Sequence, residues 1–139
     1  MTDAPHRPRP RVTPLTEAFW TGGRDGHLRI QRCRVCSFWV HPPSPVCTQC
    51  LGRDLEFATA SGRAHVVAST VNHQAWYPGW STPYSVAIVE LVEQPGLRCT
   101  TNIVDCPPER VRIGMPVAAR FEAHGDVWLP LFAPDDDSP

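Results

Sequence analysis

Four cysteines in two closely spaced pairs constrain the fold of this chain more than any other feature. Each pair has the spacing Cys-x-x-Cys, and ten residues separate the pairs: Cys33, Cys36, Cys47 and Cys50. A Cys-x-x-Cys turn aims two thiolates at one point, and two such turns complete a tetrahedron around zinc at Zn–S distances of about 2.3 Å. Four thiolates leave no open coordination position, so the pattern predicts a structural Zn²⁺ site. A segment with so little core of its own needs this metal for stability.

Three other interpretations of these cysteines have less support. Two disulfides would suit a secreted domain, but Met1–Arg11 lacks the apolar core of a secretory signal. A rubredoxin-like site would accept iron, although nothing nearby indicates electron transfer. A redox Cys-x-x-Cys motif does not normally occur as two pairs together. The remaining thiols, Cys99 and Cys106, are expected to be small buried hydrophobic residues.

The charge composition argues against several function classes. The formal net charge is −1, and all thirteen basic residues are Arg. The chain therefore lacks the basic excess of a dedicated nucleic-acid binder, and it has no lysine for Schiff-base chemistry. Four arginines near the cysteines would offset a formally dianionic zinc tetrathiolate: Arg29, Arg32, Arg34 and Arg53. No apolar run approaches the roughly 20 residues needed to span a membrane, so we expect a cytoplasmic protein without a membrane partner.

The N-terminal third should hold one helix and the zinc module. Residues 1–12 are rich in Arg and Pro and are expected to be a disordered arm. Residues 14–22 predict a short helix with Thr13 as N-cap and Gly22-Gly23 as its end, packed on its own domain or on a partner. Short strands at 28–31 and 38–40 should flank the first cysteine pair. Helix and zinc ribbon together are predicted to occupy residues 13–56.

A β pattern fills residues 57–133. Five strands are predicted, at residues 62–73, 84–92, 97–104, 117–123 and 127–132. The nearly continuous apolar run at 84–92 predicts burial on both faces. Five strands in this length favour a small OB-fold barrel, although the pattern alone leaves an open sandwich almost equally plausible. Residues 134–139 are an acidic tail that should be solvated. The predicted fold is thus mainly β: a short N-terminal helix, a rubredoxin-like zinc ribbon and a five-stranded OB-fold barrel.

Motifs along the chain resemble one known family. They are Phe19-Trp20, Gly26-His27-Leu28, the two cysteine pairs, Pro42-Pro43, Ser61-Gly62-Arg63, Pro83-Tyr84, Val89-Glu90-Leu91, Thr101-Asn102, residues 112–117 and Leu129-Pro130-Leu131-Phe132. In this order, over residues 15–133, they resemble the acyl-CoA-associated OB-fold family with a rubredoxin-like zinc ribbon, catalogued as domain of unknown function 35. The resemblance implies a non-catalytic accessory subunit of a hetero-oligomer. Its partner would be a thiolase-like enzyme, which could be a thiolase, an aldolase or an acyltransferase, that acts on acyl-CoA or related thioesters.

Aromatic residues outside the strongest strands are the candidate contacts in such a role. The loop at 75–83 carries Trp76, Tyr77 and Trp80, and a second candidate patch is Phe19 with Trp20. Exposed aromatic residues are enriched at interfaces and pockets. They would contact a partner or the acyl-CoA, unless they simply cover the barrel end or the core.

Two arginines and one alternative function complete the candidate list. Arg63 and Arg98 would meet coenzyme A phosphates, unless they form only a solvated face. The alternative function is a single-stranded nucleic-acid-binding module, because zinc ribbons and OB-folds with aromatic residues also serve that purpose. The sequence contains neither a nucleophile elbow nor a phosphate-binding glycine loop, so its motifs do not indicate an independent enzyme.

The sequence departs from the family pattern after each cysteine pair. Members usually have Gly directly after the second cysteine, where it relieves a left-handed backbone conformation. Here Ser37 and Leu51 occupy those positions, and Gly52 comes one residue late. We therefore expect slightly distorted turns around an intact metal site.

Overall fold

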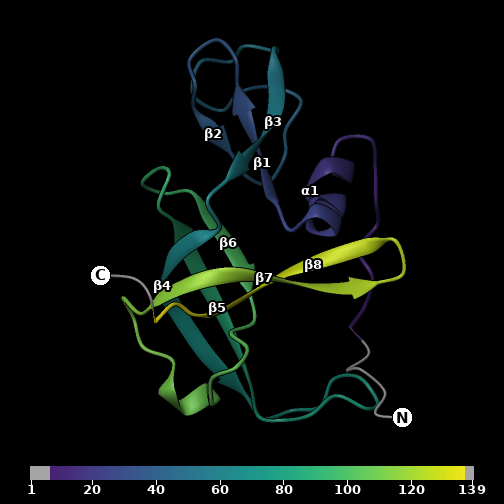
Figure 1. Ribbon diagram of the computed structural model, residues 1–139, viewed down its shortest axis with the longest axis vertical. Helices are drawn as coiled ribbons and strands as arrows, with labels where there is room; N and C mark the ends of the chain where they lie inside the picture. The colour runs from purple at the N-terminus through teal and green to yellow at the C-terminus, as the bar shows by residue number, and fades with distance from the viewer. Residues whose placement is uncertain (1–6, 137–139) are drawn as a thin grey trace.

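Two β-sheets form the body of the molecule, and the smaller lies above the larger in Figure 1. The computed structural model describes residues 7–136. The smaller sheet has the strand order β2-β1-β3, and the larger has the order β6-β5-β4-β7-β8. The predicted mainly β fold, with one short helix followed by a ribbon and a five-stranded barrel, is confirmed.

The helical segment differs in its ends from the prediction. The α-helix α1 spans Glu17–Thr21 and continues into a 3₁₀-helix, η1, at Gly22–Asp25. Thr13 Oγ1 accepts a hydrogen bond from the Thr16 N–H at 3.3 Å, so a capped turn precedes α1. The left-handed residue that ends the segment is Gly26, with φ of 75°.

The α-helix ends at the predicted glycines, with Gly22 as its C-cap, and Gly23 serves close packing in the 3₁₀-helix that follows. A Cβ at this position would lie 2.4 Å from Trp128 Cβ and 2.7 Å from Phe121 Cδ1. Phe121 belongs to β7 (Pro116–His124) and Trp128 to β8 (Val127–Pro134), so η1 sits directly on the last hairpin of the larger sheet. The sequence shows the glycine but not the neighbour that requires it.

The smaller sheet carries the cysteine pairs. Its strands are β1 (Leu28–Cys33), β2 (Trp39–Val40) and β3 (Leu55–Ala60). β1 pairs antiparallel with β3 along its whole length and with β2 at two positions. The sequence placed the start of the β pattern at residue 57, but β3 begins at Leu55 and belongs to the ribbon sheet.

The larger sheet closes almost completely into a barrel. Its strands are β4 (Arg63–Asn72), β5 (Tyr84–Leu91), β6 (Arg98–Thr101), β7 (Pro116–His124) and β8 (Val127–Pro134). A parallel bridge between Ile103 and Phe132 joins the chain after β6 to β8. Two backbone bonds form this seam: the Val104 N–H donates to the Phe132 carbonyl at 2.8 Å, and the Phe132 N–H donates to the Asn102 carbonyl at 3.2 Å. Ser85 Oγ of β5 holds Ile103 in place, because it accepts from the Ile103 N–H and donates to the Ile103 carbonyl, both at 3.1 Å. These contacts distinguish a barrel from the open sandwich.

The strand β5 is buried on one face and not on both. Ser85, Ala87, Val89 and Leu91 are buried, and the residues between them are only half-buried. The barrel interior takes the first set, and no second layer covers the outer face within the described chain. The continuous apolar run at residues 84–92 therefore predicted burial on both faces of a strand that has only one buried face in the barrel.

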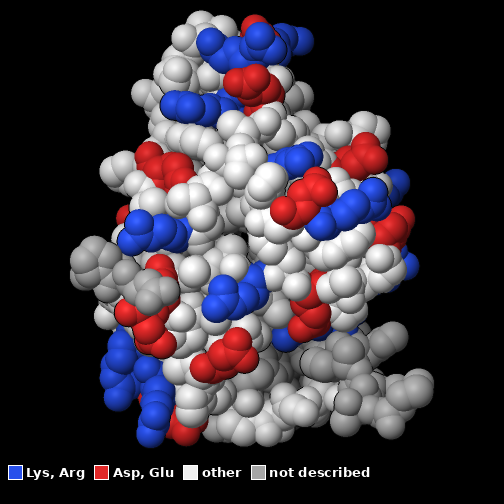
Figure 2. All heavy atoms as spheres, viewed as in Figure 1, with Lys and Arg blue, Asp and Glu red and all other residues white. Residues whose placement is uncertain are grey.

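One hydrophobic core joins the ribbon to the barrel. It includes Phe19 of α1, Ile30 of β1 and Trp39 of β2 together with barrel residues such as Val66 and Phe132. Basic and acidic side chains are intermingled over the face shown in Figure 2. Both ends of the described chain are hydrogen-bonded to β7. Arg7 Nε donates to Glu122 Oε1 at 2.9 Å, and the Asp135 N–H donates to the Pro116 carbonyl at 3.0 Å.

Candidate metal centre and adjoining groove

The two Cys-x-x-Cys turns have matching backbone geometry. In the first, the Val35 N–H donates to Cys33 Sγ at 3.4 Å, and in the second the Gln49 N–H donates to Cys47 Sγ at 3.3 Å. The residue after each pair donates back to the carbonyl of the first cysteine, at 3.0 Å in both turns. Such turns present two sulfur atoms to one point and supply N–H donors that favour the thiolate form.

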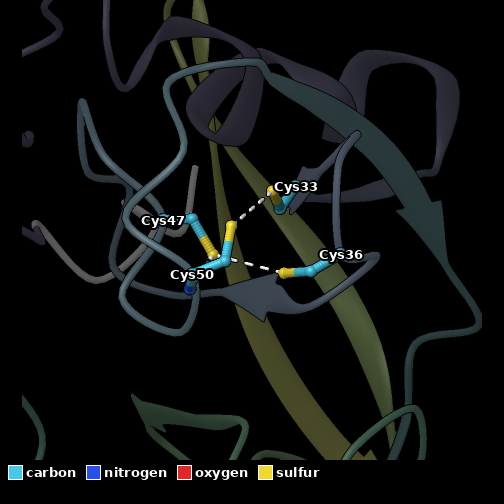
Figure 3. A group of neighbouring side chains, drawn as sticks. All are labelled: Cys33, Cys36, Cys47 and Cys50. Atoms are coloured by element: carbon cyan, nitrogen blue, oxygen red, sulfur yellow. Dashed lines mark hydrogen bonds between the residues drawn. The ribbon is translucent and has the colours of Figure 1, made fainter.

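The four sulfur atoms form a cluster that fits zinc (Figure 3). All lie within 4.8 Å of one another, with 3.7 Å between the Sγ atoms of Cys33 and Cys50 and 3.6 Å between those of Cys36 and Cys47. A tetrahedron with Zn–S distances of about 2.3 Å has edges of about 3.8 Å. All four thiols are free, which excludes the disulfide interpretation for this structure.

Electrostatics in the cluster favour a bound cation. The backbone N–H of Cys36 lowers the pKa of Cys33, and the N–H of Cys50 lowers the pKa of Cys47 to about 7. The pKa of Cys36 is raised to about 12, because desolvation and the three neighbouring sulfur atoms outweigh the N–H of Phe38. Four sulfur atoms this close ionise together only around a positive ion, which the closed tetrahedron would hold for stability and not for chemistry.

The turns keep left-handed geometry without glycine. Ser37 has φ of 66° and Leu51 has φ of 65°, whereas Gly52 is outside the left-handed region. Both non-glycine residues thus adopt a conformation that L-amino acids disfavour. The expected distortion of the turns is not seen, because their hydrogen bonds match, and the missing glycines are reflected only in two strained residues.

A groove of about 550 Å³ lies between the ribbon and the barrel. Its walls come from the arm (Arg7, Pro8), from α1 and the residue before it (Thr16, Phe19, Trp20), from the ribbon (His41, Pro42, Pro43), from Trp80, from residues 98–102 and from residues 129–132. The walls are mainly apolar, with guanidinium groups contributed by Arg7 and Arg98. This volume and lining are typical of small-molecule sites.

The structure brings together some of the sequence-predicted contact residues and separates others. Phe19, Trp20 and Trp80 all line the groove, with the rings of Phe19 and Trp20 edge to face at 4.8 Å. Trp76 is 68% exposed and lies outside the groove. Tyr77 is half exposed and borders a separate depression with Arg7 and His124.

The two arginines proposed as phosphate contacts also separate. Arg63 is at the start of β4, where its Nε lies 3.7 Å from Asp135 Oδ2, and it does not line the groove. Arg98 does line the groove, is 56% exposed and pairs with Glu90 at 3.2 Å. The Pro42-Pro43 pair and the two arm residues were not predicted as groove residues, because only the fold brings them to α1.

His41 and the two remaining cysteines show no catalytic arrangement. His41 contacts the Phe19 ring, and burial lowers its pKa to about 4. Its Nδ1 is buried with no hydrogen-bond partner in residues 7–136. Cys99 is buried, which raises its pKa to about 12, as expected for a buried hydrophobic thiol. Cys106 is only half-buried, and its thiol donates to the Pro107 carbonyl at 3.5 Å.

No helix in residues 7–136 has the length and apolar character required to cross a membrane.

Two family descriptions match consecutive parts of the chain. Residues 20–56 match "ChsH2, rubredoxin-like zinc ribbon domain", and residues 58–122 match "ChsH2, C-terminal OB-fold domain". The first segment holds both cysteine pairs with β1 and β2, and the second holds the end of β3 and most of the barrel.

Curated relatives fall into two groups. The probable enoyl-CoA hydratase alpha subunit of Thermomonospora curvata is 39% identical over 130 residues, and the 3-oxo-4,17-pregnadiene-20-carboxyl-CoA hydratase alpha subunit of Mycobacterium tuberculosis is 36% identical over 128 residues. Each match covers 92% of this chain but only 40% of the relative, so the chain spans two fifths of their length. A DUF35 domain-containing scaffold protein of Methanothermobacter thermautotrophicus is 35% identical over 99 residues, covering 68% of this chain and 71% of that protein.

Two solved structures share the architecture. A chain of the Ltp2-ChsH2(DUF35) aldolase has 38% identity and a TM-score of 0.79, with 91% of this chain and 98% of that chain covered. A DUF35-family protein of unknown function from Sulfolobus solfataricus has 17% identity and a TM-score of 0.62, covering 88% of this chain and 86% of that one, and supports the fold alone.

Proposed function

Because this chain belongs to the DUF35 family, we propose that it is a non-catalytic accessory subunit that docks on a thiolase-like enzyme acting on acyl-CoA or related thioesters. The observation that carries the proposal is the match to the Ltp2-ChsH2(DUF35) aldolase, whose description names two components. Nearly all of the matched chain in that aldolase corresponds to this one. Two further relatives are named as alpha subunits of hydratases that act on CoA thioesters.

The chemistry of the described residues supports an accessory role. The metal site is a closed set of four thiolates with no position for a substrate. Cys99 is held in its protonated form by burial, and the Cys106 thiol donates to a carbonyl. Among the described residues, neither thiol forms a hydrogen bond to a histidine or carboxylate that would activate it as a nucleophile. Bond-making chemistry would therefore come from the partner chain.

The groove beside the ribbon is the candidate contribution to an acyl-CoA pocket. Its apolar wall of Phe19, Trp20 and Trp80 suits an acyl or pantetheine chain, and Arg98 offers an exposed guanidinium at the same groove. Trp76 and Tyr77 lie outside the groove, which suits contact with the partner protein. Arg63 lies outside the groove beside Asp135 and stays a candidate contact for the partner protein.

Co-expression with a thiolase-like protein encoded beside this chain tests the proposal. We expect the two proteins to purify as one hetero-oligomer. Trp80→Ala should weaken acyl-CoA binding by the complex and leave its assembly intact, whereas Trp76→Ala should weaken assembly. Separate elution of this chain from every such candidate would overturn the accessory role.

Nucleic-acid binding has less support as an alternative. The net charge is −1, and Figure 2 shows acidic side chains among the basic ones with no continuous basic stripe on that face. A salt titration with single-stranded DNA separates the two functions, because phosphate neutralisation gives a steep dependence of affinity on salt. We expect no such dependence for this chain.

A further inference from the structure

Arg7 brings a guanidinium group into the wall of the groove. It belongs to residues 7–13, which have no regular secondary structure, yet its side chain is only 17% exposed. Two side chains of the barrel hold the guanidinium: Nε donates to Glu122 Oε1 at 2.9 Å, and Nη1 donates to Asn102 Oδ1. A long side chain loses conformational freedom when it is ordered in this way. Ordered placement in a cavity wall is what a ligand-binding residue requires.

The two partners of Arg7 are themselves fixed. Asn102 Nδ2 donates to the Ser85 carbonyl at 2.7 Å, which leaves Oδ1 as the acceptor for Arg7. Glu122 Oε1, which accepts from Arg7, also lies 2.6 Å from His124 Nε2. The guanidinium therefore has a defined orientation before any ligand binds. Such preorganisation reduces the entropy that a binding site loses when it takes up its ligand.

Several N–H groups of Arg7 have no acceptor within residues 7–136. A guanidinium carries five N–H donors, and only one on Nε and one on Nη1 are used. The only buried side-chain polar atom without a partner in this part of the chain is His41 Nδ1, so Nη2 of Arg7 still has an accessible surface. Because Arg7 lines the groove, a ligand bound there can reach the remaining donors.

The charge of Arg7, unlike its hydrogen-bonding capacity, is already balanced. Arg7 and Glu122 form an ion pair whose two side chains are only 17% and 27% exposed. A phosphate or carboxylate at the same place would bring a second negative charge close to Glu122, and like charges repel strongly where water is largely excluded. A carbonyl oxygen can accept the remaining N–H groups without adding charge. The site therefore favours a neutral acceptor.

We propose that Arg7 is a ligand-binding residue of the groove and donates to a carbonyl oxygen in the acyl-pantetheine portion of a bound thioester. Glu122 and Asn102 are its positioning residues. This proposal rests on the proposed function, which supplies the ligand. The mainly apolar walls of the groove suit the chain on either side of that carbonyl, which is either the thioester or a pantetheine amide.

Arg7→Ala and Arg9→Ala form a matched pair of variants. Arg9 lies in the same segment and pairs with Asp126, but it borders the separate depression and not the groove. Binding of octanoyl-CoA to the co-purified complex is measured by calorimetry. We expect the dissociation constant to rise about tenfold or more for Arg7→Ala, as for a lost hydrogen bond to a charged donor, and to stay within twofold for Arg9→Ala. Both variants should still assemble with the thiolase-like subunit.

A double-mutant cycle tests the positioning role. Glu122→Ala should weaken octanoyl-CoA binding less than Arg7→Ala does, and it should add nothing in the Arg7→Ala background. Additive losses from the two substitutions would overturn the positioning role, because Glu122 would then act independently of Arg7.

A thioether probe identifies the carbonyl. S-octyl-CoA lacks the thioester oxygen, so a smaller effect of Arg7→Ala on this probe than on octanoyl-CoA assigns the contact to the thioester. An equal loss for both probes assigns it to a pantetheine amide. Unchanged binding of both probes by Arg7→Ala, or equal losses for Arg7→Ala and Arg9→Ala, would overturn the contact and leave the proposed function standing. Failure of the wild-type complex to bind either probe would overturn the contact together with the acyl-CoA role of the groove.

Discussion

The side-chain amide of Gln94 forms both possible hydrogen bonds with the backbone of Trp39. Gln94 Nε2 donates to the Trp39 carbonyl and the Trp39 N–H donates to Gln94 Oε1, each at 2.9 Å. Gln94 lies between β5 and β6 of the barrel, and Trp39 begins β2 of the ribbon. One side chain thus completes the edge of the ribbon strand and fixes the ribbon to the barrel.

Gln94→Ala should therefore destabilise the junction. The substitution leaves the backbone N–H and carbonyl of the buried Trp39 without partners, which costs about 1–3 kcal/mol. Urea unfolding measures the loss, and Gln74→Ala, in an exposed loop position, is the control. Gln94→Glu should also destabilise, because a carboxylate accepts the Trp39 N–H but cannot donate to its carbonyl. Stability of Gln94→Ala equal to the control would show that the junction depends on packing alone.

Gly23→Ala tests the contact between η1 and the last hairpin. The new Cβ would lie 2.4 Å from Trp128 Cβ, so the 3₁₀-helix or the hairpin must move. Overpacking of this kind typically costs about 1–3 kcal/mol. Gly26→Asn is a suitable control because the position is open and left-handed, a conformation that Asn tolerates. A Gly23→Ala protein that melts with the wild type would contradict the close packing.

Glu90 gives the fold a defined dependence on acid. The Gly96 N–H and then the Arg98 guanidinium hold its pKa below the ordinary value of 4.5. A lowered folded-state pKa means that the ionised form adds stability above the ordinary value, and that this addition is lost as the pH falls below about 4.5 toward the folded-state pKa. Glu90→Gln should thus be less stable than the wild type at pH 7, with the difference shrinking in acid. Glu109→Gln, at an exposed position, is the control for the substitution at pH 7.

Cys47→Ser should remove the metal and unfold the ribbon. Three thiolates hold zinc far less well than four, and the small sheet depends on the ion for its stability. We expect one zinc per wild-type chain by elemental analysis and a large loss in the variant. Cys106→Ser is the matched control, because Cys106 lies outside the cluster. Full zinc content in Cys47→Ser would contradict the four-thiolate site.

Local patterns predicted the parts of this fold that depend on local chemistry. The cysteine spacing identified all four members of the cluster, and alternating or apolar runs located all five barrel strands. β3 escaped notice because its register is set by β1, whose paired residues lie 22 to 32 positions earlier in the chain. The glycine pair marked the end of the α-helix, but the packing role of Gly23 could not be predicted because the residues that require it are Phe121 and Trp128.

The groove was only partly predictable for the same reason. Phe19, Trp20 and Trp80 stood out as aromatic residues, but Pro42-Pro43 and Arg7 join them only through long-range packing. The position of Gly52, one residue late, predicted the left-handed conformation of Leu51, whereas the exposure of the Leu51 side chain could be seen only in the structure.

Turnover of an acyl-CoA thioester is the most direct test of an accessory role. Three samples are compared: this chain alone, the co-purified thiolase-like subunit alone, and the two together. We expect no turnover by this chain alone and a higher rate or greater stability of the partner in the mixture. Turnover by the isolated chain, or a partner whose activity and stability are the same with and without it, would contradict the proposed function.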